Sequence, residues 1–427
     1  MDRSSSSTTN AIGLCLLPSE LIQSIFLSLV LPEILPLKLV NKFFSSIISD
    51  HTFIRQCNTM SSSTTWLFVY KKLWLRDAVL HAFTNRSSDR WFRIPISELL
   101  KPVQFHGEDL YFLAASGNVF LFASNTVGEV IAINLVNVTV KKIPPCPLGP
   151  RGTSLWRRSG MKLVIDPTHS GQFSFMFAEF VGNRPVLFVY SSESDTWKSM
   201  EVREINANRL LPRGGGHVFL NLVNEPRESV VVVYTPDCNT SVVIRPRFID
   251  VNDQRLTIGF NWGNSIDRLH VYGDGYMMIV KSKDGENNRI IGNMRVLEGV
   301  ELWGLSLDGR NWEFVSRVPN EVMKVIEKPY GAMMGCLEEN NGIIRGALVS
   351  NYKGFWNMTW LSFDTKLNKW SWISLPDCKM KGWNMAGISF SSGLTLQNEL
   401  TFNGKGCFWV MVNDVTNVDE DVKVSCD

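Results

Sequence analysis

The stretch Trp360–Pro376, WLSFDTKLNKWSWISLP, contains the unit from which most of this sequence is built. An apolar run reaches Asp364, Trp370 follows within a second short run, and Pro376 closes the unit. Short runs rich in aromatic and β-branched residues, bounded by Gly, Pro, Asn and Asp, are typical of β-strands joined by turns. The stretch therefore predicts two neighbouring strands with a turn at Asp364.

The same unit recurs through the chain from residue 66 onward. Clear copies occupy residues 186–197 and 302–319, and weaker copies surround three further turn residues. Successive turn residues lie 49, 57, 59, 58 and 56 positions apart, and they are Asn85, Asn134, Ser191, Asp250, Asp308 and Asp364. Each period has room for four strands, and a unit of this kind buries its hydrophobic face only by stacking on its neighbours.

A ring of such units is a β-propeller, in which radial repetition leaves only short sheet edges exposed. We expect six blades within residues 66–427, with seven as the alternative. The ring closes when strands from both ends of the chain share one blade. The apolar run 402–412 is expected to supply the closing strand, with residues 66–70 as its partner.

A different pattern precedes the repeats, in the apolar stretch Leu17–Phe53. Ser19 is a suitable N-cap, and apolar residues recur over 21–29 at the spacing of one helix face. Pro32 suits the start of a second, short helix, and the helical period resumes over residues 40–48 for a third. Three helices in about 40 residues lie below the size at which a chain usually folds alone, so we expect them to pack on a partner.

This stretch resembles an F-box, whose pattern runs Leu-Pro-x-Glu-Leu-Leu, Ile-Leu, Leu-Pro-Leu-Pro, Val-Cys-Lys-x-Trp and a closing Phe. The chain has LPSELI at 17–22, IF at 25–26, LVLP at 29–32, VNKFF at 40–44 and a Phe at 53. The departures are Val30, Asn41 and Phe44, which replace Pro, Cys and Trp, and Pro36, which is expected early in the second helix. The repeated unit, a turn followed by a Trp, resembles the exit of a kelch repeat, although most copies lack the usual Gly-Gly pair. An F-box followed by kelch repeats is the domain order of plant F-box/kelch proteins.

The resemblance implies a non-catalytic substrate receptor of a Skp-cullin-F-box ubiquitin ligase, without a cofactor or metal. The helices would dock on a Skp-type adaptor and, through it, on a cullin scaffold and a RING protein, while the propeller holds a target protein for ubiquitination and proteasomal degradation. Residues 1–12 would be a disordered N-terminus, 13–58 the F-box, 59–65 a linker and 66–427 the propeller. The expected adaptor-binding residues are Leu17, Pro18, Leu21, Ile25, Leu29, Pro32, Leu39, Val40 and Phe43.

The composition of the chain argues against several classes of partner, binding site and cellular location. A net charge of +2 does not point to a nucleic-acid backbone or an anionic membrane as the main partner. The eight cysteines are scattered singly, which argues against a zinc site or a dense disulfide framework and favours the cytoplasm or nucleus. The apolar run 14–39 carries three prolines and two glutamates without a preceding basic segment, so it fits neither a signal peptide nor a membrane-spanning helix.

Two motifs invite a catalytic or ligand-binding interpretation, but ordinary loops explain them better. The segment 306–312 resembles the Asp-box of sialidases but is one residue short and occurs once, so a strand-turn-strand is expected. The segment 213–217 lacks the Lys-Ser/Thr pair of a P-loop, so an inter-strand loop is expected. The six histidines share no pattern that would gather the ligands of a copper oxidase.

The tryptophans divide into two groups. Those at the repeat exits are expected to pack between blades, and they are Trp91, Trp197, Trp312 and Trp370. Aromatic and arginine side chains often anchor protein interfaces, and on that ground we predict a target-binding surface that includes Trp156, Arg157, Arg158 and Arg213.

Two other functions stay open from the sequence. One is a propeller scaffold for protein interactions without a ubiquitin role, and the other is an enzyme of the sialidase or oxidase sort. Burial of the Ile25/Leu29 face within the chain would favour the scaffold, and exposure of that face would favour the receptor.

Overall fold

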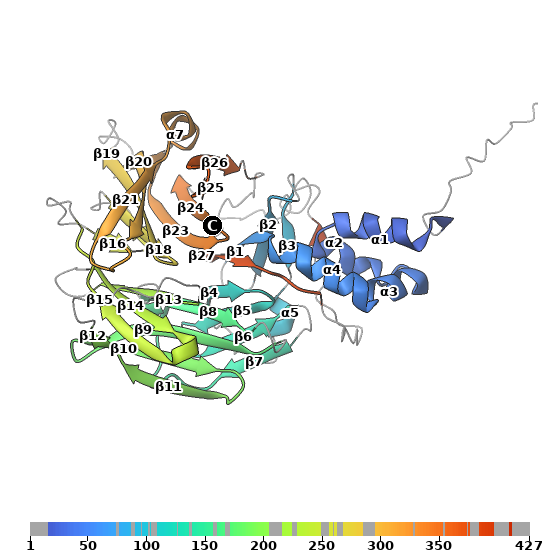
Figure 1. The fold of residues 1–427 in the computed structure, drawn as a ribbon, viewed down its shortest axis with the longest axis horizontal. Helices are drawn as coiled ribbons and strands as arrows, with labels where there is room; N and C mark the ends of the chain where they lie inside the picture. The colour runs from blue at the N-terminus through green and yellow to red at the C-terminus, as the bar shows by residue number, and fades with distance from the viewer. Residues whose placement is uncertain are drawn as a thin grey trace, which may run out of the picture.

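Six β-sheets surround a central axis in the computed structural model, and a group of helices stands at one side of them (Figure 1). The structure describes residues 16–396 and 410–411, except for the internal segments 74–76, 87–89, 95, 101–102, 104–108, 126, 136–138, 157–159, 167–170, 205–215, 224–228, 249–255, 259, 263–267, 285–294, 328, 353–354, 374 and 376–383.

The first three sheets, in order around the axis, have the following strands from the inner to the outer edge. Blade one contains β27 (Asn384–Ser392), β1 (Thr65–Leu73), β2 (Asp77–Thr84), β3 (Phe92–Ile94) and β28 (Val410–Met411). Blade two contains β4 (Leu110–Ser116), β5 (Val119–Ser124), β6 (Val130–Asn134) and β7 (Thr139–Ile143). Blade three contains β8 (Met161–Ile165), β9 (Phe173–Val181), β10 (Arg184–Ser191) and β11 (Thr196–Glu201).

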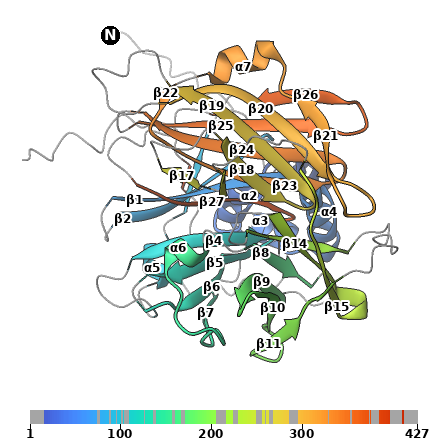
Figure 2. The same cartoon turned by 90° about the vertical axis from the view of Figure 1, so that its left-hand side faces the viewer.

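The other three sheets complete the ring. Blade four contains β13 (Val218–Val223), β14 (Ser229–Thr235), β15 (Thr240–Ile244) and β12 (Arg203–Glu204). Blade five contains β16 (Leu256–Ile258), β18 (Arg268–Gly273), β19 (Tyr276–Asp284), β20 (Arg295–Leu305) and β21 (Trp312–Arg317), with β22 (Pro329–Tyr330) beside β20. Blade six contains β17 (Phe260–Trp262), β23 (Ala332–Asn340), β24 (Ile343–Tyr352), β25 (Phe355–Asp364) and β26 (Lys369–Ile373). The sheets fan out around the axis in Figure 2, which confirms the predicted six-bladed propeller.

The ring closes inside blade one, but not through the predicted strand. Residues 65–72 pair with 384–392 of β27, so the partner of β1 precedes the run 402–412. Within that run the structure describes only β28, which pairs with Arg93 and Phe92 at the opposite edge of the same sheet. The prediction of 402–412 as the partner of β1 is therefore wrong, although both ends of the chain share one blade.

Blade four also differs from the predicted repeat. Its turn between the second and third strands is the short helix η2 (Pro236–Cys238), and Asn239 follows in a left-handed conformation with φ 47°. The predicted turn at Asp250 lies outside the described residues. No Trp follows in β15, whose sequence is TSVVI, so the pattern used to place the turns has no marker there.

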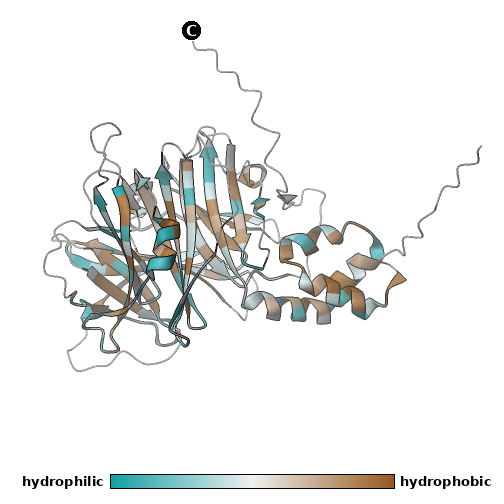
Figure 3. Ribbon diagram, turned by 90° about the horizontal axis from the view of Figure 1, so that it is seen from above, coloured by the Kyte–Doolittle hydropathy of each residue, from teal (hydrophilic) through white to brown (hydrophobic). Residues whose placement is uncertain are grey.

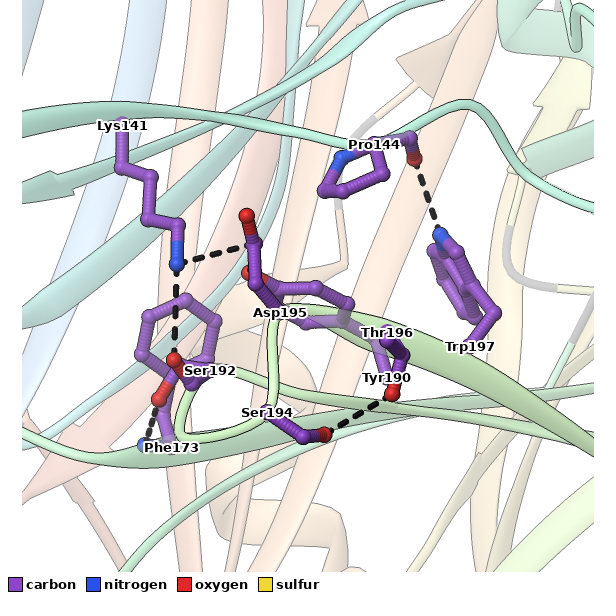
Figure 4. Close-up of polar contacts among 9 residues, drawn as sticks. All are labelled: Lys141, Pro144, Phe173, Tyr190, Ser192, Ser194, Asp195, Thr196 and Trp197. Atoms are coloured by element: carbon purple, nitrogen blue, oxygen red, sulfur yellow. Dashed lines mark hydrogen bonds and ion pairs between the residues drawn. The ribbon is translucent and has the colours of Figure 1, made fainter.

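The repeat tryptophans pack between blades, as predicted. Trp197 on β11 donates its indole N–H to the carbonyl of Pro144, which follows the last strand of the preceding blade, at 2.8 Å (Figure 4). Trp370 on β26 donates likewise to Ser316 on β21 at 2.9 Å. Trp91 and Trp312 are buried in apolar clusters that span blades one and six, and blades four and five.

Four helices precede the propeller and form what we call the helical domain. They are α1 (Ser19–Ser28), α2 (Leu31–Leu37), α3 (Lys42–Ile48) and α4 (His51–Ser62), whereas the sequence predicted only three. Pro18 rather than Ser19 is the N-cap of α1. Asn41 and Asp50 cap α3 and α4 through side-chain oxygens that accept backbone N–H groups, which is the usual way to satisfy the first turn of a helix. Within the described part of the propeller there are three more short helices, namely α5 (Ser97–Leu100), α6 (Thr153–Trp156) and α7 (Asn320–Ile326).

The helical domain shares its hydrophobic core with the first two blades. Phe53 and Cys57 of α4 belong to the same buried cluster as Phe68 of β1 and Phe120 of β5. The side chain of Asn58 also accepts the backbone N–H of Leu396 at 2.7 Å and donates to its carbonyl at 3.0 Å. The partner that covers one face of these helices is therefore the propeller of the same chain.

Candidate functional site

The helical domain keeps a second set of apolar side chains in solvent. Leu21 and Ile25 lie one turn apart on α1 and are 52% and 39% exposed. Leu39, Val40 and Phe43, in the connection from α2 to α3 and its first turn, are 54%, 60% and 40% exposed. We call these five residues the exposed apolar set. In Figure 3 the helical domain projects from one side of the propeller, so these helices can be reached from outside.

The two faces of α1 explain how the set is held outward. Ile22 and Phe26 are fully buried one position further along the helix from Leu21 and Ile25. The Phe26 ring meets Phe44 of α3 edge-on, with ring centroids 5.1 Å apart. Because α1 and α3 are joined by this buried contact, their outer faces are fixed with respect to each other.

The nine residues predicted to bind an adaptor do not all lie at the surface. The five of the exposed apolar set and Pro18 are exposed. Leu17 and Leu29 are half-buried against the core that the helices share with the propeller. Pro32 is buried, so its side chain holds the helices together and is not open to a partner. Periodicity alone could not separate these roles.

The four departures from the F-box pattern are accommodated locally. Asn41 accepts the N–H of Phe44 at 2.7 Å, and the Phe44 ring lies in the core. The backbone N–H of Val30 donates to Glu33 Oε2 at 2.9 Å, which satisfies a free donor at the start of α2. Pro36 lies late in α2 rather than early, and the helix ends one residue later, as expected where a proline cannot donate to the helix ladder.

Of the four residues predicted to bind a target, the structure describes only Trp156, and its side chain is not at the surface. Trp156 has no exposed surface: its ring packs against Phe175 and Phe177, and the Arg151 guanidinium lies over it at 4.8 Å. Its side chain is therefore part of the core of blades two and three and is not available to a partner. Arg157, Arg158 and Arg213 lie outside the described residues.

The segment that resembles an Asp-box forms a hairpin turn. Ser306 Oγ donates to Asp308 Oδ1 at 2.6 Å, and the N–H of Arg310 donates to the same oxygen at 3.0 Å. These bonds keep the pKa of Asp308 below its ordinary value. Gly309 provides the left-handed conformation of the turn, with φ 69°. The side chains of Ser306 and Asp308 are thus used to hold the shape of the turn, as expected for a strand-turn-strand.

Metal and membrane sites were also sought in the part of the chain that the structure describes. No group of three His, Cys, Asp or Glu side chains there is arranged to hold a metal ion. Among the same residues, no helix combines the length and the hydropathy needed to cross a membrane. Four cysteines fall within the described ranges, and each is a free thiol: Cys57, Cys146, Cys238 and Cys336.

Sequence reasoning missed one group of polar residues at the propeller axis, Lys162, Asn221, Asp274 and Glu338. They belong to four successive blades and lie roughly one repeat apart in the sequence, so no local motif contains more than one of them. A polar residue on the inner strand of each successive repeat is the signal that could have found them.

Comparisons with known proteins do not assign the chain to a family. No family model matches the chain, and no curated protein matches it. Similar solved structures include a nidogen/laminin complex (9% identity, TM-score 0.37, covering 78% of this chain and 100% of that one). They also include TolB from Acinetobacter baumannii (10% identity, TM-score 0.39, 82% and 73%) and a TolB from Agrobacterium tumefaciens (9%, 0.33, 77% and 97%). At this level of similarity they carry no argument, and it is the arrangement of its own sheets and helices that makes the protein a six-bladed β-propeller with an N-terminal helical domain.

Proposed function

We propose that this chain is the substrate receptor of a Skp-cullin-F-box ubiquitin ligase. The helical domain would bind a Skp-type adaptor through the exposed apolar set, and the propeller would hold the target protein. The observation that carries the proposal is that Leu21, Ile25, Leu39, Val40 and Phe43 remain exposed although other apolar side chains of the same helices are buried in the core shared with the propeller.

Two considerations support this interpretation. Large apolar side chains gathered on one small domain are a common mark of a protein-binding surface. These residues also occupy positions of the stretch that resembles an F-box, so the resemblance and the exposure point to the same side chains. The nature of the adaptor is taken from the resemblance.

The proposed mechanism is proximity. A target held by the propeller gains a high effective concentration near the ubiquitin-charged enzyme that the adaptor and cullin bring to the complex. The shared core between α4 and the propeller would keep the two binding sites at a fixed separation. No residue of this chain needs to react.

The test is binding of the purified full-length chain to a purified Skp-type adaptor, measured by calorimetry. A double variant, Ile25→Asp with Val40→Asp, is expected to weaken binding at least tenfold because it places two charges in an apolar interface. The control is Leu367→Asp, which changes an apolar residue that is 73% exposed in the turn between β25 and β26. Point variants are preferred to deletion of residues 1–58, because that deletion would cut α4 and uncover the core of blade one.

Adaptor binding that is unchanged in the double variant would contradict the proposal. Failure of the wild-type chain to bind any Skp-type adaptor would favour the interaction scaffold without a ubiquitin role. The half-burial of Leu29 and the burial of Pro32 against the chain itself are the observations that favour the scaffold.

A further inference from the structure

A cavity of about 370 Å³ lies on the propeller axis, lined by residues of all six innermost strands. These strands are β27, β4, β8, β13, β18 and β23, and each contacts the next around the ring. Aromatic and aliphatic side chains such as Phe112 and Leu337 form part of the wall. The cavity is large enough for a small organic molecule.

Charged groups gather at one end of this cavity. Lys162 Nζ pairs with Asp274 Oδ1 at 2.5 Å, and Asp274 Oδ2 accepts the backbone N–H of Glu339 at 3.1 Å. Asp274 follows β18 directly, and Ser392 ends β27, so this end of the cavity is where those inner strands finish. The short strands β16 and β17 pair with the opposite, first halves of β18 and β23.

The carboxylate of Glu338 is less well satisfied than that of Asp274. It accepts one long hydrogen bond, from Ser392 Oγ at 3.4 Å. The charged groups that act on it are Lys162 from β8, Asp274 after β18 and Arg345 from β24. Arg345 donates to the backbone carbonyls of residues 340 and 343, at 3.5 and 3.4 Å. Since Lys162 is already paired with Asp274, the only side-chain hydrogen bond to Glu338 that the described residues show is the long one from Ser392.

A second acceptor in the wall has no hydrogen-bond partner among the residues that the structure describes. It is Oδ1 of Asn221 on β13, a residue that is 6% exposed and lines the cavity. A buried polar atom without a partner costs stability, and native proteins rarely retain one without a reason. The backbone of Asn221 is also approached closely by Gly160, just before β8, where a Cβ would lie 2.5 Å from the Asn221 nitrogen, so the two inner strands pack tightly at this point.

We propose that the axial cavity binds a small organic cation with N–H donors, a primary ammonium or a guanidinium, between Glu338 and Asn221. The cation would add a positive charge for Glu338, since Lys162 is already paired with Asp274, and N–H donors for Glu338 and Asn221. The apolar wall would hold its carbon chain. The site is separate from the exposed apolar set, and it does not depend on the proposed ubiquitin ligase function.

Burial raises the pKa of Glu338 to about 7, with the Asp274 carboxylate adding to the effect and Lys162 and Arg345 opposing it. A bound cation favours the ionised carboxylate, so binding should release about half a proton at pH 7 and affinity should rise about tenfold from pH 6 to pH 8. These two signatures would not be produced by a cation that binds elsewhere on the surface.

The experiment is calorimetry of the full-length chain with agmatine, which carries both an amine and a guanidinium. Tetramethylammonium, a cation without N–H donors, and glutarate, an anion of similar length, are the comparison ligands. The variants are Glu338→Gln, which mimics the protonated carboxyl, and Asn221→Leu, which keeps the volume but removes the acceptor. The control variant is Glu129→Gln, whose carboxylate pairs with Lys142 at 2.8 Å outside the cavity.

Agmatine is expected to bind the wild-type chain and Glu129→Gln equally, and to bind Glu338→Gln and Asn221→Leu at least tenfold more weakly. Glu338→Gln should also lose the pH dependence and the proton release. The proposal is overturned if agmatine does not bind at 10 mM, if it binds both cavity variants as well as the wild type, or if tetramethylammonium binds equally well. Should Glu338→Gln fail to fold, Asn221→Leu alone decides between these outcomes.

Discussion

The ionisation of Glu338 should directly change the free energy of unfolding of the propeller. Its pKa in the folded protein, about 7, lies above the ordinary value of 4.5, so the folded state holds a proton that the unfolded state releases between these values. The folded state is therefore favoured below about pH 4.5, and this contribution is lost as the pH rises through 7.

The variant Glu338→Gln cannot ionise at this position, so its stability should not fall in this way as the pH rises. We expect the variant to be more stable than the wild type by about 1–2 kcal/mol at pH 8, after allowance for the partial exposure of Glu338 to the cavity, and equally stable near pH 4.5. Urea unfolding at both pH values, followed by tryptophan fluorescence, measures the difference. A difference that does not change with pH would show that Glu338 is not ionised with a raised pKa.

Asn41 is a residue at which a departure from the F-box pattern has a structural use. Its side chain accepts the N–H of Phe44 at the start of α3. Asn41→Ala should therefore lower the free energy of unfolding by about 1 kcal/mol. Ser46→Ala on the exposed face of the same helix is the control, with an expected change below about 0.5 kcal/mol. Equal effects of the two changes would contradict a capping role.

At the scale of elements, the repeated tryptophan on the outermost strand is what joins one blade to the next. Trp197 on β11 reaches the carbonyl of Pro144, and Lys141 of the same preceding blade pairs with Asp195 at 2.9 Å (Figure 4). Trp197→Phe keeps an aromatic ring but leaves that carbonyl without its donor.

We expect Trp197→Phe to lower the free energy of unfolding by about 1–2 kcal/mol, since it removes one hydrogen bond and some apolar contact. Trp372→Phe on β26 changes a tryptophan that is 40% exposed and should have a smaller effect. Chemical denaturation of the two variants in parallel is the measurement. A larger loss for Trp372→Phe would mean that the tryptophan between blades is not what stabilises their contact.

The elements also show where sequence reasoning succeeded and where it stopped. Turns at Asn134, Ser191 and Asp364 end the strands β6, β10 and β25, because each is marked by a local change from apolar to polar residues. Blade four lacks the Trp marker, and the turn predicted there, at Asp250, lies outside the described residues. The closing strand was misplaced because β27 and the run 402–412 are both apolar, and strand pairing across more than 300 residues leaves no local signal.

The candidate sites were predictable to different degrees. The helical period located the apolar residues of α1 and α3, but it could not say that Pro32 turns inward and Leu39 outward, since this depends on how α2 and α4 pack. The cavity residues Lys162, Asn221 and Glu338 meet only when the ring closes. Their proximity is a property of the tertiary structure, and no single repeat predicts it.

At the scale of the whole molecule, the helical domain and the propeller are parts of one cooperative unit. Phe53 and Cys57 of α4 lie in the same core as Phe68 of β1, and Asn58 bonds both backbone groups of Leu396. The charged pair of Arg90 and Glu33 connects blade one to α2. A domain held by a shared core should not unfold separately from the sheet that completes it.

This arrangement predicts a single unfolding transition. Far-ultraviolet circular dichroism and tryptophan fluorescence should give the same urea midpoint in the wild-type chain. Asn58→Leu should lower that midpoint by an amount equivalent to about 2 kcal/mol, because it leaves the N–H and carbonyl of Leu396 without partners at the junction. The control is Gln56→Leu, on the exposed face of α4. Another Asn→Leu change, Asn239→Leu, is unsuitable because the backbone of Asn239 is left-handed. Two separate midpoints in the wild type would mean that the helices fold on their own. The exposed apolar set would then not be held at a fixed position relative to the propeller, and such a fixed position could not explain how a bound target is presented.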